Sequence, residues 1–422
     1  MTSFRYLNHE LYCEDARLSE LIAEFGSPLY VYSRRAIVEN CRAIEAAFEG
    51  YLHRTTYAVK ANANVYLLKL IAEQGLGADV GSKGELFIAL NAGFPPDSIS
   101  FSGVGKRDDE IAYALEEDIY AFNVESKQEL EVISTIASRL GKTARILLRL
   151  NLDIDAGTHA YISTGQKHNK FGISSRKAVE ILGWAQHLPS VEIRGVHSHI
   201  GSQILSQRAF VEAAHALERV VGELRNNNIA VHEVDFGGGF GIRYHGVLTH
   251  PRLPAEKMES ETLSAAEFLK TVLPILRKTE CTITIQPGRS IVGDAGVLVT
   301  TVLYRKEQEG KNFVVIDGGM NDLIRPSLYQ AHHQIVPLQL SNTIIEEVDV
   351  VGPCCESGDF FAQDRLLPLV SRGDVLAVLC AGAYGYVLSS NYNSRLRPAE
   401  VLVNGSQATS IRSRENLEDL LS

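Results

Sequence analysis

The strongest constraint on the fold of this chain is a rhythm of eight short apolar runs separated by amphipathic stretches. The apolar runs lie near 56–59, 78–80, 99–102, 119–122, 144–150, 193–197, 231–235 and 282–286. The amphipathic stretches include 64–74, 83–92, 126–140, 175–187, 207–227 and 263–277. Because short β-branched runs indicate buried strands and periodic apolar residues indicate helices, the pattern predicts a (β/α)8, TIM-like barrel. A doubly wound parallel sheet is the alternative.

After about residue 295 the pattern changes to strand-like runs with few helical stretches between them. The runs are Val297–Tyr304, Phe313–Ile316, Ile344–Val350, Val375–Leu379 and Glu400–Val403. They predict a β-rich second domain, a sandwich or a barrel, and we expect the strand-like segment Leu29–Tyr32 to join it. The expected domains are a barrel of residues 34–290 and a β-rich domain of residues 1–33 plus 291–422.

The composition is sufficient for a large core and disfavours several kinds of partner. The chain has 422 residues, is 45% hydrophobic and carries a net charge of -10, so neither nucleic acid nor an anionic membrane is expected as a partner. No apolar run is long enough to span a bilayer, and Met1–Arg5 shows no signal segment. We therefore expect a cytoplasmic protein. The six cysteines form no CxxC pair and are expected to be reduced thiols.

Unusual polar residues follow the expected strands, where a barrel of this type places its chemistry. They are Lys60, Asp79, Arg149, His197 to Ser202, Asp235 with Gly237-Gly238-Gly239, and Gln286-Pro287-Gly288-Arg289. Lys60 ends an apolar run, and a partly buried lysine there would lose its proton readily and could form an imine with an aldehyde. The glycine run lets backbone N–H groups approach an anion, although it matches neither GxGxxG nor the P-loop.

The lysine Lys60, the glycine run and a residue that can pack on an aromatic ring, such as His199, together indicate a pyridoxal phosphate site. No carboxylate or cysteine accompanies His197 and His199 at ligand spacing, so no metal is expected. Taken alone, Lys60 could be a surface lysine, and Tyr329 and Tyr384 could be core or interface aromatics.

We expect no functional role for two basic segments of the chain. We interpret Lys106-Arg107 as a solvent-exposed turn, and we assign no role to His332-His333.

Several short motifs, spread over nearly the whole chain, carry a family resemblance. They are Tyr57-Ala58-Val59-Lys60-Ala61-Asn62, Asn169-Lys170-Phe171-Gly172, His199-Ile200-Gly201-Ser202-Gln203, Asn321-Asp322-Leu323-Ile324-Arg325-Pro326, Cys355-Glu356-Ser357-Gly358-Asp359, Gly382-Ala383-Tyr384-Gly385 and Ser389-Ser390-Asn391-Tyr392-Asn393. With them the chain resembles the fold-type III, alanine-racemase-like decarboxylases, and most closely the diaminopimelate decarboxylase family. The resemblance implies pyridoxal-phosphate-dependent decarboxylation of meso-2,6-diaminopimelate to L-lysine and CO2, the last step of lysine biosynthesis.

The resemblance also implies a role for each matching residue. Lys60 would hold the cofactor as a Schiff base, His199 would stack on its ring, and Cys355 would protonate the carbanion. The other implied cofactor contacts are Ser202, Gly238, Gly239, Gly288 and Tyr384, to which the strand-end positions add Asp79, Arg149, Gln286 and Arg289. The implied substrate contacts are Arg289, Arg325, Tyr329, Glu356 and Tyr384. In this family Cys355 and Glu356 would come from the partner subunit, so we expect a homodimer.

The implied substrate contacts would favour diaminopimelate over amino acids that have a single carboxylate. Arg289 and Arg325 would clamp the distal carboxylate of diaminopimelate, and Glu356 would pair with its distal ammonium. Amino acids without a second carboxylate would leave a buried arginine unpaired and would be rejected.

Gln286 is the main departure from the family pattern, because a glutamate is usual in its EPGR motif. A neutral amide adds no negative charge beside the pyridine nitrogen, so we hypothesise slow decarboxylation that Gln286→Glu would accelerate. Further departures at Leu152, 157–160 and His168 flank the substrate side of the barrel.

Two other functions stay open beside diaminopimelate decarboxylation. One is a related decarboxylase acting on a citryl-diamine or a carrier-bound amino acid in siderophore or antibiotic biosynthesis. The other is a cofactor-binding protein with weak or no catalysis because of Gln286. The set of Arg289, Arg325, Tyr329 and Glu356 favours diaminopimelate.

Overall fold

The chain divides into two compact units that are not contiguous in sequence. The computed structural model describes residues 3–155, 170–249, 262–340 and 344–421. Unit 1 comprises Met1–Asn40, Ile242–Thr262 and Ile291–Ser422, and unit 2 comprises Cys41–Gly241 and Leu263–Ser290. The domain boundaries expected from the sequence stay a prediction. Motif residue Asn169 and the departures at 157–160 and His168 lie outside the described residues.

Within the described residues, unit 2 contains a closed barrel of eight parallel strands. The strands are β5 (His53–Ala58), β6 (Gly77–Val80), β7 (Ile99–Phe101), β8 (Ala121–Val124), β9 (Ala144–Asn151), β11 (Val191–Ser198), β12 (Glu233–Asp235) and β13 (Thr282–Ile285). They pair in this order, and β13 pairs with β5 to close the ring. The short strand β10 (Ile173–Ser174) pairs with β9. The predicted (β/α)8 barrel is confirmed, and the doubly wound sheet is excluded.

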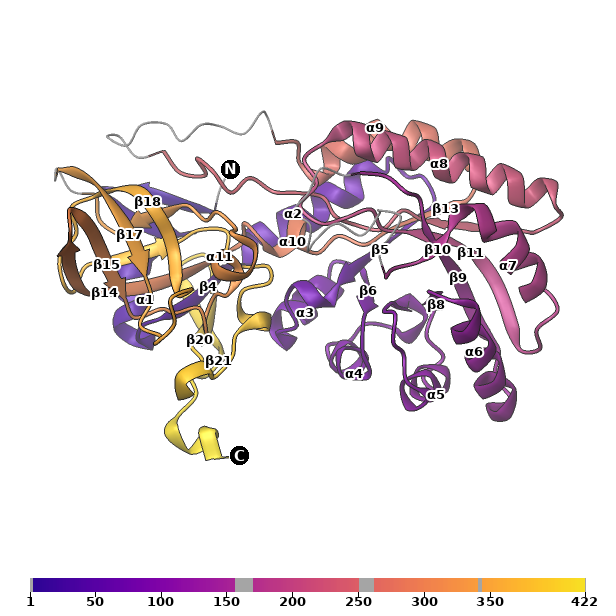
Figure 1. Ribbon diagram of the computed structural model, residues 1–422, viewed down its shortest axis with the longest axis horizontal. Coiled ribbons are helices and arrows are strands. Elements are labelled where there is room, and N and C mark those ends of the chain that lie inside the picture. Colours follow the sequence, from indigo (N-terminus) through magenta and orange to yellow (C-terminus); the bar gives the residue numbers. More distant parts are fainter. Residues whose placement is uncertain (1–2, 156–169, 250–261, 341–343, 422) are drawn as a thin grey trace. The chain divides into compact units, whose positions relative to one another are not determined.

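Helices cover the outer side of the barrel strands (Figure 1). They are α3 (Val65–Ala72), α4 (Lys83–Asn91), α5 (Asp108–Glu116), α6 (Lys127–Leu140), α7 (Ala178–Ala185), α8 (Gln207–Asn226) and α9 (Ala265–Leu276), and α2 (Arg34–Ala47) precedes β5. In α6 the predicted apolar face is buried at Leu130, Ile133 and Ala137. The side chain of Ser126 caps this helix by accepting the N–H of Glu129 at 3.1 Å. No helix in the described part of the chain is long and apolar enough to cross a membrane.

Unit 1 is built on a mixed sheet with the strand order β18-β17-β15-β14-β4-β20-β21. Its strands are β4 (Leu29–Ser33), β14 (Gly296–Gln308), β15 (Lys311–Ile316), β17 (Ile345–Val351), β18 (Phe360–Pro368), β20 (Ala399–Asn404) and β21 (Gln407–Arg412), while β19 (Val375–Val378) pairs with β14 and with β16 (Ile335–Pro337). Smaller elements are β1 (Phe4–Leu7), β2 (Glu10–Cys13), β3 (Ala16–Arg17), α1 (Leu18–Phe25), α10 (Arg289–Val292) and α11 (Arg325–Tyr329).

The N-terminal strand β4 joins this sheet, as predicted, and lies in its middle. Val31 is paired with Val297 on its antiparallel neighbour β14 and with Val401 on its parallel neighbour β20. All three valines are fully buried. Burial of β-branched residues from three distant parts of the chain therefore stabilises the β-rich unit.

Candidate functional site

The loops at the carboxyl ends of the barrel strands are joined to one another by backbone hydrogen bonds. Ala58, the last residue of β5, donates its N–H to the carbonyl of Pro287 after β13 at 3.0 Å. Gln286, also after β13, donates its N–H to the carbonyl of Gly237 after β12 at 2.8 Å. Three loops that are far apart in sequence thus form one rigid floor at this end of the barrel.

Two of the predicted cofactor glycines are required by close packing. A Cβ added to Gly238 would lie 2.0 Å from the carbonyl oxygen of Gln286, and one added to Gly288 would lie 2.9 Å from the Cβ of Ala61. Both distances are shorter than real contacts, so a side chain at either position would push the loops apart. The glycine run therefore brings backbone N–H groups close to the strand ends.

Lys60 lies in the 3-10 turn η1 (Val59–Ala61) directly after β5. Our expectation that it is partly buried is wrong, because its side chain is exposed. The strand ends at Ala58, and in the turn that follows Val59 and Ala61 are buried while Lys60 between them is exposed. Its positive charge lowers the pKa of His199 and opposes the burial that raises the pKa of Asp79. Lys60 therefore shares one electrostatic environment with these two residues.

The side chain of Gln286 bridges two buried carboxylates. Its Nε2 donates to Asp235 Oδ2 at 2.8 Å and to Asp79 Oδ1 at 3.2 Å, while its Oε1 lies 3.2 Å from Nε2 of His197. Asp79 also accepts the hydroxyl hydrogen of Ser102 at 2.5 Å. Burial raises the pKa of Asp79 and raises that of Asp235 well above its usual range. The amide at position 286 thus separates two acids that repel when both are charged.

His199, the predicted ring-stacking residue, is oriented by the glycine run. It follows β11, is half-buried, and accepts the backbone N–H of Gly238 on its Nδ1 at 3.2 Å. Burial, followed by the charges of Lys60 and Arg149, holds its pKa well below the usual range. The imidazole is therefore neutral at physiological pH, which suits stacking on an aromatic ring.

Arg149 forms a buried ion pair. Its guanidinium donates to Glu125 and lies 4.5 Å from the ring centroid of Phe171. The second carboxylate oxygen of Glu125 accepts the N–H of Gly172 at 2.7 Å. The pair thus fastens part of the predicted Asn169–Gly172 motif to the barrel. Glu125 was missed from sequence, although its place directly after β8 is the signal that located the other residues.

The segment after β13 provides groups that fit a phosphate. Arg289 is buried, and its Nη2 donates to Ser202 Oγ at 3.0 Å. The hydroxyl of Ser290 is a buried oxygen that has no hydrogen-bond partner among the described residues. A guanidinium, two hydroxyls and a glycine backbone are the groups that a phosphate ester requires. Together with the amine of Lys60, they fit pyridoxal phosphate.

Of the expected exposed turn Lys106-Arg107, Arg107 is exposed and Lys106 is not. The side chain of Lys106 is only 1% exposed and does not form a solvated turn. The ammonium donates to Glu129 Oε1 at 2.7 Å and to the carbonyls of Gly103 and Asn123 at 2.8 Å and 2.7 Å. Three acceptors at the ends of neighbouring elements thus compensate the desolvation of this charge.

In unit 1, the predicted substrate residues Arg325 and Tyr329 are the first and last residues of α11. The hydroxyl of Ser327, in the same helix, donates to the carbonyl of Gly358 at 2.6 Å. Gly358 belongs to the loop between β17 and β18 that also carries Cys355-Glu356. The structure therefore brings the predicted carboxylate-binding helix next to the predicted proton-donor loop.

The two adjacent cysteines of this loop differ in environment. Cys355 is exposed, and its backbone N–H donates to Asn393 Oδ1 at 2.8 Å. Cys354 is half-buried, and burial, followed by the charge of Asp359, raises its pKa to about 11. Of the two thiols, that of Cys355 is therefore the more accessible to a ligand. All six cysteines lie in the described residues and are free, as expected.

The last two predicted residues of unit 1 lie in irregular segments. Glu356 is exposed, and its Oε2 accepts the hydroxyl hydrogen of Tyr392 at 3.4 Å. Tyr384 is half-buried in the loop after β19 and has a left-handed backbone conformation with φ of 56°. That conformation is unusual for an aromatic residue and is often associated with function.

The predicted site residues divide between the two units. Unit 2 carries Lys60, Asp79, Arg149, His199, Ser202, Gly238, Gly239, Gln286, Gly288 and Arg289, and unit 1 carries Arg325, Tyr329, Cys355, Glu356 and Tyr384. Their individual roles stay predictions.

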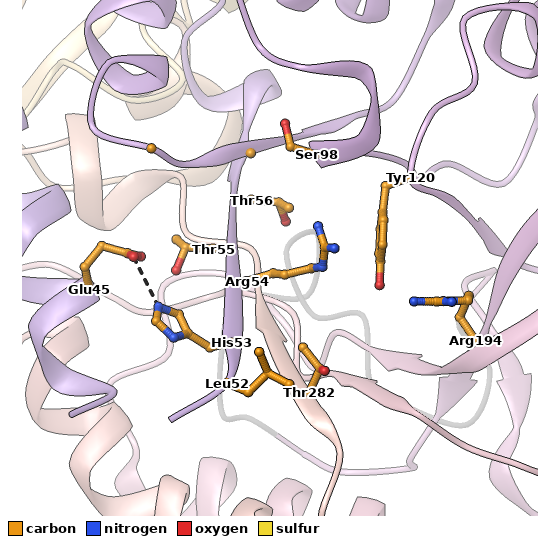
Figure 2. Close-up of a pocket in the computed structure, with 12 residues that line it drawn as sticks. Glu45, Leu52, His53, Arg54, Thr55, Thr56, Ser98, Tyr120, Arg194 and Thr282 are labelled. Atoms are coloured by element: carbon orange, nitrogen blue, oxygen red, sulfur yellow. Dashed lines mark hydrogen bonds and ion pairs between the residues drawn. The ribbon is translucent and has the colours of Figure 1, made fainter. Parts of the chain in front are cut away.

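A hollow of about 470 Å³ occurs at the opposite, amino-terminal end of the barrel strands (Figure 2). His53 and Glu45 on its wall pair at 3.1 Å, and the guanidinium carbon of Arg54 lies 3.8 Å from the ring centroid of Tyr120. These four lining side chains thus contact one another in pairs. Because barrel chemistry occurs at the carboxyl ends of the strands, we do not assign this hollow to the reaction.

The barrel, the lysine turn after β5 and the phosphate-compatible groups after β13 define a class, the pyridoxal-phosphate-dependent barrel enzymes. The family model for the pyridoxal-binding domain of pyridoxal-dependent decarboxylases matches residues 34–293. The cofactor of this class is pyridoxal phosphate, and the protein is an enzyme of this class.

Similarity over the full length specifies the family. The chain is 45% identical over 413 residues to diaminopimelate decarboxylase of Aquifex aeolicus, covering 98% of this chain and 95% of the relative. The structure is similar to that of diaminopimelate decarboxylase from Helicobacter pylori complexed with L-lysine (TM-score 0.89, 41% identity, 95% and 98% covered). It is also similar to that of the M. jannaschii enzyme in complex with L-lysine (TM-score 0.91, 35% identity, 100% and 98% covered). The chain belongs to the diaminopimelate decarboxylase family.

Proposed function

We propose that this protein decarboxylates meso-2,6-diaminopimelate to L-lysine and CO2, as the last step of lysine biosynthesis in the cytoplasm. The observation that carries the proposal is the pair of buried arginines, Arg289 and Arg325, which provide guanidinium groups for a carboxylate. The loop after β17 adds an exposed thiol at Cys355 and an exposed carboxylate at Glu356. These groups match a substrate with an ammonium and a carboxylate at its distal end. The relatives' names and their L-lysine complexes support the same substrate.

Each residue contributes a defined step to this reaction. Lys60 would hold pyridoxal phosphate through its amine, which can react with the aldehyde of the cofactor. When bound, pyridoxal phosphate would provide an aromatic ring that takes up the electron pair left on the carbon from which CO2 departs. The thiol of Cys355 then donates a proton to the carbon that lost the carboxylate. Arg325 and Arg289 bind the distal carboxylate, and Glu356 pairs with the distal ammonium.

We further propose that Cys355 and Glu356 of the partner subunit complete the site that contains Lys60. The family resemblance supports this arrangement, as does the exposure of the loop that carries both residues. A homodimer would then hold two sites that each need both subunits.

The test compares the wild type with Lys60→Ala and Cys355→Ser, each prepared with pyridoxal phosphate. We expect the wild type to show the visible absorbance of bound cofactor and to release CO2 from meso-diaminopimelate. Lys60→Ala should lose the absorbance, Cys355→Ser should keep it but react far more slowly, and Lys69→Ala, an exposed lysine of α3, should match the wild type.

Mixing the two inactive variants tests the shared site directly. Random exchange would make half of the dimers mixed, each with one intact site, so activity should return to about a quarter of the wild-type value. No recovery would contradict a shared site. Cofactor absorbance in a wild type that releases no CO2 would contradict the proposed reaction and favour a cofactor-binding protein or another substrate.

A further inference from the structure

His333 is a fully buried histidine whose two ring nitrogens both contact fixed groups of unit 1. Nδ1 lies 2.8 Å from the carbonyl oxygen of Leu379, and Nε2 lies 2.7 Å from Nη1 of Arg325. A carbonyl oxygen only accepts a hydrogen bond, and a guanidinium only donates one. His333 is therefore a neutral imidazole that carries its hydrogen on Nδ1 and accepts from Arg325 on Nε2.

The histidine itself is held by two strands. The N–H of Leu379, the residue after β19, donates to the carbonyl of Gln334 at 2.9 Å, just before β16 begins. Arg365 of β18 donates to the carbonyl of His333 at 2.9 Å. The ring of His333 therefore has little freedom to move.

Arg325 is confined from a second side by an aromatic ring. The guanidinium carbon lies 4.8 Å from the ring centroid of Tyr244, and this ring meets His333 edge-on at 5.1 Å. Both Arg325 and Tyr244 are only 5% exposed. The hydrogen bond to His333 and the cation–π contact with Tyr244 thus restrict a long side chain that would otherwise lose much entropy on binding a ligand.

We propose that His333 is a positioning residue that holds the guanidinium of Arg325 ready for the distal carboxylate of the substrate. This inference rests on the proposed function, since it requires that Arg325 binds a substrate carboxylate. A neutral acceptor suits this task because it fixes the arginine without neutralising its charge. A carboxylate in place of His333 would compete with the substrate for the same cation.

The test of this proposal uses the cofactor-loaded enzyme and two separate variants of His333. His333→Asn keeps a donor for Leu379 but is too short to reach Arg325, whereas His333→Gln is long enough to accept from it. We expect the Asn variant to raise KM for meso-diaminopimelate about tenfold, as for the loss of one charged hydrogen bond. Its kcat should change less than twofold, because a distal contact binds substrate and transition state equally. The Gln variant should recover most of the affinity.

Two product-like inhibitors separate positioning from general damage. L-lysine carries a carboxylate and cadaverine carries none, so the Asn variant should weaken inhibition by L-lysine about tenfold and leave cadaverine unchanged. Equal weakening of both inhibitors, or an unchanged KM, would overturn the proposal. His332→Asn changes the neighbouring histidine, whose Nδ1 accepts from Arg365, and should behave as the wild type.

A measurement on the wild type covers the case in which the variants fold poorly. Nitrogen-15 NMR of labelled histidines should show a hydrogen on Nδ1 of His333 and none on Nε2, and a hydrogen on Nε2 would overturn the proposal. Absence of CO2 release from the wild type would defeat the proposed function and this inference together. Wild-type activity with an unaffected Asn variant would defeat this inference alone.

Discussion

The side-chain amide of Gln286 donates a hydrogen bond to the carboxylate of Asp235 at 2.8 Å, in the buried interior of the barrel. The same amide nitrogen donates to Asp79 at 3.2 Å. Gln286 is thus more than a neutral replacement for the glutamate expected at this position, because it separates two acids whose pKa values burial raises. The charge that the family pattern places at position 286 would here have two acidic neighbours.

Gln286→Glu is therefore expected to reduce stability even where it raises kcat as hypothesised from sequence. A third buried carboxylate should cost about 3 kcal/mol of unfolding free energy at pH 8. In the folded state the acids keep their protons to higher pH than in the unfolded chain, so their contribution to stability is greatest below about pH 4 and is lost as pH rises. The difference in Tm between variant and wild type, measured calorimetrically, should thus grow from pH 5 to pH 8.

Adding Asp79→Asn to Gln286→Glu provides the control for this mechanism. Removal of one neighbouring carboxylate should reverse much of the decrease in Tm that Gln286→Glu causes at pH 8. A Tm difference that does not depend on pH, or no recovery in the double variant, would show that repulsion between the acids is not the cause.

Gly238→Ala should open the floor of the barrel site. Its Cβ would lie 2.0 Å from the backbone oxygen of Gln286, so the glycine run must move away from the end of β13. We expect the affinity for pyridoxal phosphate, measured by fluorescence titration, to fall at least tenfold. Gly222→Ala in α8 is the matched control, since its Cβ would meet no atom within 4 Å, and it should keep cofactor affinity and gain slightly in stability. Equal affinity in the two variants would contradict the packing argument.

Lys106→Met should be among the most destabilising changes to a charged residue of unit 2. Its ion pair with Glu129 is buried, and loss of one partner from such a pair costs about 3–5 kcal/mol. Lys83 pairs with Asp109 at 3.3 Å on the surface, with both side chains about half exposed, so Lys83→Met should cost less than about 0.5 kcal/mol. Urea unfolding of the two variants measures this contrast. Similar losses in both would mean that Lys106 is effectively solvated.

Cys355 should react with iodoacetamide well before Cys354. Cys355 is exposed, whereas the pKa of Cys354 is raised to about 11, so little of it is thiolate at pH 8. Peptide mass spectrometry after brief alkylation should find the label on Cys355, with loss of CO2 release in parallel. The slow labelling of Cys354 should accelerate as pH rises toward 11. Preferential labelling of Cys354 at pH 8 would contradict these assignments.

Much of the fold was predictable because it follows from local patterns. The alternation of β-branched runs with amphipathic stretches specifies strands and helices within windows of about ten residues. The place of Lys60, Asp79 and Gln286 at strand ends then follows, since parallel barrel strands direct their carboxyl ends to one face. The segment Leu29–Tyr32 could be assigned to the β-rich unit because its apolar and aromatic residues are typical of a strand, as are the runs after residue 295.

The burial and the hydrogen-bond partners of the charged residues depend on tertiary structure. Lys60 looked partly buried and is exposed, and Lys106 looked solvated and is buried, because burial depends on how a turn leaves its strand. His333 gave no signal in sequence, since its meaning comes from the carbonyl of Leu379 and the guanidinium of Arg325.

The sequence by itself thus determined the barrel, the β-rich unit, the cofactor class and the set of reactive residue types, which depend on local pattern and motif. Only the tertiary structure decided which charges each of these residues meets. Gln286 and Asp79 are 207 residues apart in the chain yet share a hydrogen bond. Electrostatic effects act through distance in space, and the folded chain alone sets that distance.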